Sequence, residues 1–239
     1  MALPMMNTPV YTMEIPSTGQ KVKYRPFLIK EEKALLIAQG SEDPNVMIET
    51  LKGVVKSCVQ DKIDVDLLAT FDLEYMFTQL RAKSVGEEIS LIFPCDTCPD
   101  DNEKARVKIN FDLTKIKVEK SPDHNKKIEL FGDVGVVMRY PTVDSIKKFD
   151  VLDKTDLDSV FDIIAENVEF IYQGEEIFYA KEQKKQDILD FLGNLTSDQF
   201  IKLQKFYETM PRIRQEVNYA CPVCGRIHNK VLEGLESFF

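Results

Sequence analysis

Four of the five cysteines in this 239-residue chain form two pairs, each with two residues between its members. Two intervening residues let both thiolates of a pair converge on one ion from a tight turn, and four thiolates in a tetrahedron are a common structural zinc site. The sequence therefore predicts one bound Zn²⁺. Its ligands would be Cys95 and Cys98 from the first pair, and Cys221 and Cys224 from the second.

The local sequence around each pair indicates a zinc knuckle at the tip of a hairpin. Gly225 directly follows the second pair and can adopt a positive φ that turns backbone N–H groups toward sulfur. Pro99 follows the first pair, which makes that knuckle less ideal. The pairs lie far apart, with 123 positions from Cys98 to Cys221, whereas a compact zinc ribbon separates its pairs by about 15–20 residues. One shared ion would thus fasten the middle of the chain to its end.

Two other chemistries are open to these cysteines. A redox dithiol normally sits at a helix N-terminus after a strand, whereas both pairs here are expected between strands. A catalytic zinc needs an open coordination position, but four cysteines would fill all four. His228 is an alternative ligand, although four cysteines suffice without it. For His228 and His124, the pattern predicts an exposed or strand side chain.

The hydrophobic periodicity predicts helices packed on small antiparallel sheets. Strands are expected at 10–15 and 21–27 around a turn at 16–19, at 87–93 and 105–113 around the first cysteine pair, at 127–131 and 134–140, and at 212–219 and 227–231 around the second pair. Helices are expected at 30–39, from the Asp43 cap through Cys58, at 72–83, from Thr155 to Val168, at 183–192, from Thr196 onward, and at 232–239. Residues 117–126 are expected to form a polar loop.

This pattern predicts an α+β fold, in which a four-cysteine zinc-knuckle site joins two hairpins. Nothing in the sequence suggests a linker, so one domain is expected over residues 1–239, with a zinc-binding subregion formed by about 87–113 and 212–231. Cys58, the fifth cysteine, falls on the apolar side of its predicted helix. It is expected to be a buried core residue.

Composition and charge limit the classes of function. The chain is 44% hydrophobic and 30% charged, with a net charge of −9. Residues 1–40 and 201–239 each carry +2, so the middle of the chain carries −13. This distribution disfavours nucleic-acid binding, which requires a dense basic surface. No stretch is apolar enough to span a bilayer, and we expect a soluble, non-exported protein.

Catalytic signatures are missing from the sequence. There is no phosphate-binding glycine loop, no HExxH, no GxSxG, and the chain has only two histidines. We therefore expect no enzyme activity and no small-molecule substrate.

The N-terminal stretch from Ile15 through Lys33 to Ala38, IPSTGQKVKYRPFLIKEEKALLIA, resembles the baseplate hub proteins of T4-like contractile-tailed bacteriophages. The resemblance continues less sharply through 71–81, the strand ending at Cys95, and 232–239. That family includes a hub subunit and a hub assembly catalyst. It implies a structural or chaperone role among phage baseplate hub and tail proteins, in the virion tail baseplate or in the host cytoplasm during assembly.

Two groups of residues are candidates for partner binding. In the predicted N-terminal hairpin, Lys21, Lys23 and Arg25 alternate with apolar residues, so one face could pack while the other meets a partner. Phe238 and Phe239 end the chain and would either pack in the core or insert into a neighbour. The competing functions are a zinc-ribbon nucleic-acid-binding regulator, indicated by the CPVCG motif and the basic ends, and a thiol–disulfide enzyme.

Overall fold

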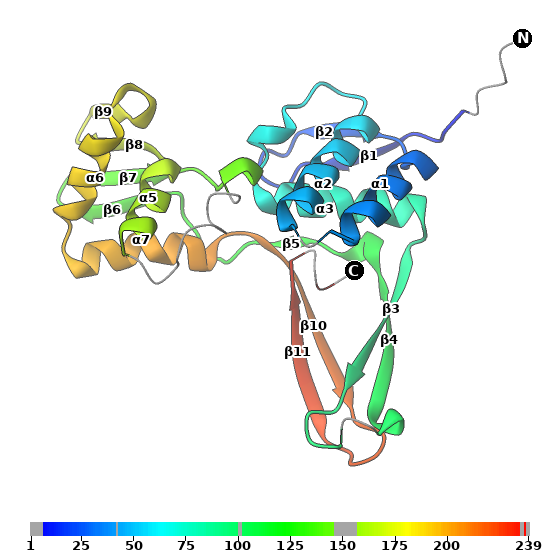
Figure 1. The fold of residues 1–239 in the computed structure, drawn as a ribbon. Helices are drawn as coiled ribbons and strands as arrows, with labels where there is room; N and C mark the ends of the chain where they lie inside the picture. The colour runs from blue at the N-terminus through cyan, green and yellow to red at the C-terminus, as the bar shows by residue number, and fades with distance from the viewer. Residues whose placement is uncertain (1–6, 42, 100–101, 146–156, 235–236, 238–239) are drawn as a thin grey trace, which may run out of the picture. The chain divides into compact units, whose positions relative to one another are not determined.

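The computed structural model of this protein describes residues 7–41, 43–99, 102–145, 157–234 and 237. The fold is α+β with small antiparallel sheets, as predicted (Figure 1). The chain divides into two compact units. Unit 1 comprises Met1–Glu119 with Arg212–Phe239, and unit 2 comprises Lys120–Pro211. The prediction of a single domain over residues 1–239 stays a prediction.

The N-terminal part of unit 1 packs helices beside a two-stranded hairpin. Its elements are β1 (Tyr11–Glu14), β2 (Lys21–Tyr24), α1 (Ile29–Gln39), α2 (Pro44–Cys58), the 3-10 helix η1 (Val65–Leu67) and α3 (Thr70–Ser84). The predicted hairpin is confirmed, although β2 ends three residues before the predicted end at Phe27, and all three predicted helices are confirmed within one or two residues. The Asp43 carboxylate accepts a hydrogen bond from the N–H of Asn45 and so caps α2. Cys58 is fully buried at the other end of α2.

A buried carboxylate connects the hairpin to α3. Asp72 is completely buried in the first turn of α3, where negative charge is favourable. Its two oxygens accept hydrogen bonds from the N–H of Ser17 in the β1–β2 turn, at 2.8 Å, and from the N–H of Ala69, at 3.2 Å. Both acceptor oxygens are therefore satisfied, and the turn is anchored to the start of the helix.

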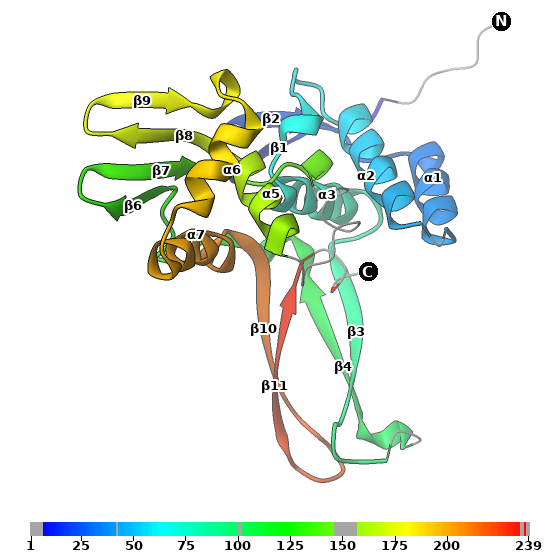
Figure 2. The same ribbon diagram turned by 60° about the vertical axis from the view of Figure 1, so that its left-hand side comes forward.

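Two long hairpins form the rest of unit 1 and lie side by side in both views (Figures 1 and 2). They contain β3 (Glu88–Pro94), η2 (Glu103–Ala105), β4 (Arg106–Asp112), η3 (Leu113–Lys115), β5 (Val118–Glu119), β10 (Arg212–Ala220) and β11 (Ile227–Glu233). β3 pairs with β4, and β10 lies between β11 and β5. The hairpins pack through alternate apolar residues, with Phe93, Val217 and Tyr219 buried at the centre.

The sequence was wrong about two segments of unit 1. The predicted loop at 117–126 contains β5, which pairs with the start of β10. The predicted helix at 232–239 begins instead as strand, because Leu232 lies opposite Gln215 and Glu233 opposite Arg214 in the β10–β11 ladder. The end of that prediction falls mostly outside the described residues.

Unit 2 is a four-stranded antiparallel sheet with helices on one face. The strands β6 (Lys127–Phe131), β7 (Val134–Met138), β8 (Val168–Gln173) and β9 (Glu176–Tyr179) are neighbours in that order (Figure 2). The helices are α5 (Leu157–Asn167), η4 (Ala180–Glu182), α6 (Lys185–Gly193) and α7 (Ser197–Thr209). The core joins residues of β6 and β7, such as Leu130 and Val136, to residues of the helices, such as Ile164, Leu192 and Leu203.

The sequence missed half of this sheet. Val168 was expected to continue a helix, but α5 ends at Asn167 and Val168 begins β8. β8 and β9 form a hairpin at Gly174, whose φ of +58° suits glycine. The expected cap of that helix, Thr155, lies outside the described residues. The capping box of α7 is confirmed by reciprocal hydrogen bonds between Thr196 and Gln199.

His124 in unit 2 is buried, which corrects the expectation of an exposed or strand side chain. It stacks on Tyr140 with ring centroids 5.6 Å apart. Its Nδ1 lies 3.1 Å from the Thr209 hydroxyl, and its Nε2 lies 3.1 Å from the Tyr140 hydroxyl. Burial lowers the pKa of His124, and the nearby charges of Lys120 and Lys126 lower it further.

Because of this lowered pKa, unit 2 should lose stability in mild acid. The unfolded chain takes up a proton at the ordinary histidine pKa of about 6.5, whereas the folded chain resists protonation until lower pH. The stability that neutral, buried His124 contributes to the folded state is therefore fully present above about pH 6.5 and is lost as the pH falls below that value. Thermal melts of the wild type and His124→Gln between pH 8 and 5 should differ in their pH dependence. The Tm of the wild type should fall more steeply with decreasing pH. Parallel profiles would contradict this assignment.

Candidate metal centre

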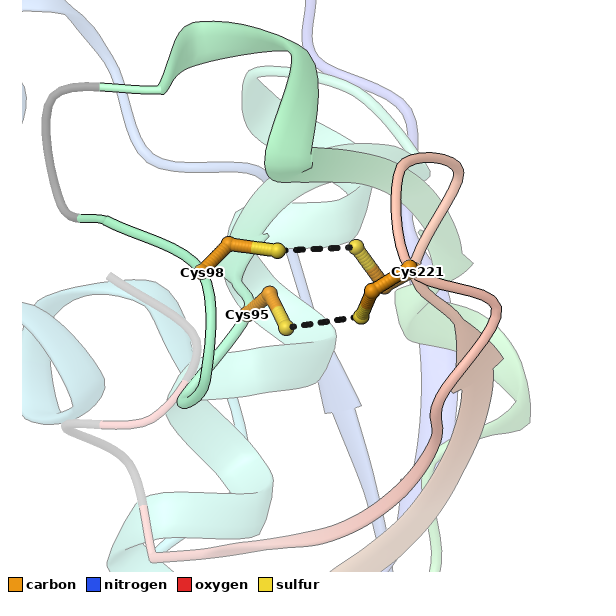
Figure 3. A group of neighbouring side chains, drawn as sticks. Cys95, Cys98 and Cys221 are labelled. Carbon is orange, nitrogen blue, oxygen red and sulfur yellow. Dashed lines mark hydrogen bonds between the residues drawn. The ribbon is translucent and has the colours of Figure 1, made fainter.

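The two cysteine pairs lie at the tips of the two long hairpins of unit 1. Cys95 and Cys98 follow β3, and Cys221 and Cys224 occupy the β10–β11 turn. Figure 3 shows the thiols of Cys95 and Cys98 pointing toward the turn that carries Cys221. All four are free cysteines. The chain thus brings together the four residues that the spacing singled out.

Backbone hydrogen bonds build the second knuckle as expected. The N–H of Gly225 donates to the carbonyl of Cys221 at 2.9 Å, and the N–H of Cys221 donates to the carbonyl of Arg226 at 2.8 Å. Gly225 has a φ of +72°, the conformation proposed for it from the sequence. The turn therefore places Cys221 and Cys224 on the same side.

The first knuckle is closed differently, because Pro99 follows Cys98. The N–H of Cys95 donates to the carbonyl of Ala105 at 3.1 Å, and the short helix η2 returns the chain to β4. Cys95 and Ala105 are both buried beside Cys221. Despite the proline, this turn also directs its two thiols toward a common point.

The sulfur atoms have the separations that a tetrahedral metal requires. The Sγ atoms of Cys95 and Cys224 are 3.7 Å apart, and those of Cys98 and Cys221 are 3.8 Å apart. All four sulfurs lie within 4.8 Å of one another. Four sulfurs about 2.3 Å from a central zinc would be separated by about 3.8 Å along each edge. The residues present therefore fit a four-thiolate metal site.

The electrostatics of the cluster are uneven. Hydrogen bonds from the side chain and backbone of Thr97 lower the pKa of Cys95 to about 5. Burial, together with the surrounding thiols, raises the pKa of Cys98 to about 12. The backbone N–H of Arg226 lowers the pKa of Cys224. A divalent cation among the thiols would favour ionisation of all four, because thiolates are the form that binds metal.

Polar contacts around the cluster join one hairpin to the other. The Tyr219 hydroxyl donates to the carbonyl of Pro94 at 2.9 Å. The Lys230 ammonium contacts both oxygens of Asp96, at 3.1 and 3.0 Å. These contacts fix the two knuckles relative to each other independently of any metal.

His228 was undervalued from the sequence. It lies in β11 as a strand residue, but it is buried, and its Nε2 is 3.3 Å from the Cys95 sulfur. Its Nδ1 is 3.5 Å from Asp96, and its ring stacks on Tyr219. His228 therefore supports the cluster from outside the set of four thiols. The signal was available, since Tyr219 and His228 lie opposite each other in the ladder that the CPVCG turn closes.

The arrangement suits a structural site better than the alternatives. Both pairs follow a strand and precede another strand, whereas a redox dithiol normally lies at the N-terminus of an α-helix. Four sulfur ligands around one ion leave no position for a catalytic water. Cys58 belongs to the helical part of unit 1, where burial raises its pKa.

The candidate partner-binding residues have different environments. Lys21 and Lys23 are exposed on β2. Arg25 is not: its guanidinium forms an ion pair with the buried Glu31 at 3.0 Å and donates to the carbonyl of Ser57. This corrects the expected alternation, in which Arg25 shared the exposed side. Phe238 and Phe239 lie outside the described residues.

Comparison with known proteins decides the family. Residues 8–239 match the family model described as T4 bacteriophage base plate protein. The chain belongs to this family. It is also 22% identical over 232 residues to the baseplate hub assembly protein gp26 of Enterobacteria phage T4, covering 96% of this chain and 97% of that protein. No solved structure matches it.

The family assignment agrees with the N-terminal resemblance and extends it over nearly the whole chain, including both cysteine pairs. In the part of the chain that the structure describes, no helix has the length and apolar character needed to cross a membrane.

Metal binding can be tested by stoichiometry. We expect one zinc ion per chain by native mass spectrometry, with Cys58 as the one thiol outside the site. Cys224→Ser should lose the metal and lower the Tm by more than about 5 °C, since 1 kcal/mol corresponds to about 2–4 °C in a chain of this size. Hydrogen exchange should increase in β3–β4 and β10–β11. Cys58→Ala is the matched control and should retain one zinc; loss of metal without a change in Tm would contradict a structural role.

The knuckle glycine gives a second test. Gly225→Ala places a side chain at positive φ, which costs about 1–2 kcal/mol. Zinc affinity, measured by competition with a chelator, should therefore fall roughly 5- to 30-fold. The control is Gly53→Ala, which has open space around it on helix α2. That change should stabilise the helix by up to about 1 kcal/mol and leave zinc affinity unchanged. Equal affinities for the two variants would contradict the role of Gly225.

Proposed function

We propose that this baseplate protein acts in assembly of the phage baseplate hub through protein–protein contacts, and that a structural Zn²⁺ maintains its shape. The observation that carries the proposal is the similarity to the T4 hub assembly protein, which spans almost the full length of both chains. Its partners would be other baseplate hub and tail proteins. It would work in the host cytoplasm during assembly and, as a structural subunit, in the virion tail baseplate.

The structure supports a contact function over a chemical one. Among the described residues, the one cluster of metal-ligating groups is the four-cysteine site, whose geometry suits structural zinc. Zinc at the hairpin tips would hold two separate segments of unit 1 in one rigid arm. A rigid surface lowers the entropy lost on association, as an assembly factor requires. In this proposal the protein is not an enzyme.

Exposed residues of unit 1 offer contact surfaces for such partners. Lys21 and Lys23 form a basic edge on the N-terminal hairpin. At the second knuckle, Val223 in the turn and Ile227 at the start of β11 are 49% and 77% exposed, so both apolar side chains are available for contact. The proposed zinc would keep these apolar side chains in fixed positions. We also retain the terminal Phe238 and Phe239 as candidate contacts.

A phage in which this gene is deleted tests the proposal. Cells infected with the deletion phage should accumulate tails or baseplates that lack a complete hub, seen by electron microscopy, and plaque formation should fall by several orders of magnitude. Wild-type protein and Cys58→Ala supplied in trans should restore assembly, whereas Cys98→Ser should restore it poorly. Complete baseplates formed without the protein would refute an assembly role.

Two further measurements separate the remaining alternatives. Quantitative mass spectrometry of purified virions distinguishes a retained hub subunit from a transient assembly factor. The competing hypothesis, a zinc-ribbon nucleic-acid-binding regulator, requires affinity for DNA or RNA that falls steeply with salt. Absence of binding at low salt eliminates it.

A further inference from the structure

Helix α1 of unit 1 buries a charged residue and exposes large aliphatic ones, the reverse of an ordinary surface helix. It packs against α2, which lies between α1 and α3 (Figure 2). The buried residues of α1 are Glu31 and Ala38, at 6% and 3% exposure. Ile29, Leu36 and Ile37 are 78%, 64% and 66% exposed. The residues that usually attach a helix to its core therefore face solvent.

Hydrogen bonds to Glu31 hold α1 in this orientation. The Glu31 carboxylate accepts from the Arg25 guanidinium at 3.0 Å and from the Ser57 hydroxyl, at the end of α2, at 3.2 Å. It also accepts from the N–H of Leu28, at the start of α1, at 2.8 Å. Turning the helix to bury its aliphatic residues would break these bonds and leave charged groups without partners, at a high cost in free energy. The outward position of the aliphatic residues is therefore built into the fold.

The exposed aliphatic residues form one surface with a lysine at its centre. Residues three and four positions apart are neighbours on a helix, so one face of α1 carries Ile29, Lys33, Leu36 and Ile37. We call this face the α1 stripe. Lys33 is exposed, and no ion pair joins it to another of the described residues. A grouped apolar surface of this kind, unlike a single exposed aliphatic residue, is typical of a protein contact site.

We propose that the α1 stripe binds an acidic amphipathic helix of another baseplate hub or tail protein, in which apolar residues flank a central Asp or Glu. This inference rests on the proposed hub assembly function and assigns a partner surface to it. The apolar residues of the partner would bury Ile29, Leu36 and Ile37, as in other helix-to-helix recognition. Its carboxylate would pair with Lys33, because a desolvated ammonium without a partner opposes binding.

The central position of Lys33 favours this partner over a second copy and over a lipid surface. When two copies of the stripe pair symmetrically over their full length, parallel or antiparallel, the centre of one lies opposite the centre of the other. Lys33 would then face Lys33 in a desolvated interface, where like charges are strongly unfavourable. A membrane-surface helix keeps its lysines on the polar face, whereas Lys33 lies between Ile29 and Ile37. Only an acidic protein segment satisfies the charge while it buries the aliphatic residues.

Photo-crosslinking in infected cells tests the nature of the partner. The full-length chain with p-benzoylphenylalanine in place of Ile37 is supplied in trans to the deletion phage, and crosslinked peptides are sequenced by mass spectrometry. The expected crosslink joins it to a segment of another phage hub or tail protein in which apolar residues flank an Asp or Glu. The same group in place of Ile201, which is 56% exposed on α7, is the matched control and should not give this crosslink. Crosslinking only to a second copy, to lipid or to a segment without a carboxylate overturns the inference, as does the absence of any crosslink.

Substitutions on the stripe separate this inference from the proposed function. Lys33→Glu and Leu36→Glu should each lower plaque formation by the complemented deletion phage about ten-fold or more, whereas Lys33→Arg should support it normally. Lys205→Glu makes the same charge change at an exposed site on α7 and should have no effect. All these side chains face solvent, so circular dichroism and zinc stoichiometry should not change. Complete baseplates without the protein would refute the assembly function. If the wild type is required but Lys33→Glu and Leu36→Glu replace it fully, this inference alone is overturned.

Discussion

The convergence of four sulfur atoms at the tips of two hairpins is the constraint on which unit 1 depends. The sulfurs of Cys98 and Cys221 are 3.8 Å apart although the residues are 123 positions apart in sequence. To meet, the strands leading to them must keep register over their whole length, because a slip of one residue would turn every side chain to the other face. Packing of Phe93 between the hairpins, against Tyr219 at 5.4 Å, enforces that register. Metal binding and apolar packing thus favour the same arrangement.

The length of chain between the two hairpins explains why contacts that hold them together are needed. All of unit 2 is inserted between β5 and β10, so the C-terminal hairpin returns to unit 1 after a long excursion. Closing a long loop costs conformational entropy, although the cost grows slowly with length. The contacts of β10 with β5, the Tyr219 hydrogen bond to Pro94 and the Lys230 ion pair with Asp96 all oppose that cost. A structural zinc would add to them, because metal binding energy is coupled to folding.

In the proposed assembly role the protein works by presenting surfaces, and the two units do so by different means. In unit 1, the knuckles hold exposed apolar side chains on short turns. In unit 2, the helices bury one face of the sheet, while the other face and the β9 edge remain accessible. The net charge of −9 opposes non-specific association through these apolar surfaces. Specific contacts can then be made without general aggregation.

Local chemistry made much of this protein predictable from its sequence. The cap at Asp43, the capping box at Thr196 and the Cys-x-x-Cys spacings depend on neighbours within a few residues, so the sequence alone determined them. The four metal ligands could be named for the same reason. The register around the CPVCG turn places His228 opposite Tyr219, but His228 became part of the site only because Cys95 and Asp96, from the distant first hairpin, contact its ring. Arg25 turned inward because Glu31 offered a buried carboxylate, and Val168 became strand because β7 was available to pair with it. The hydrophobic periodicity of a segment shows which of its faces is apolar. Only the tertiary structure decides which distant segment packs against that face.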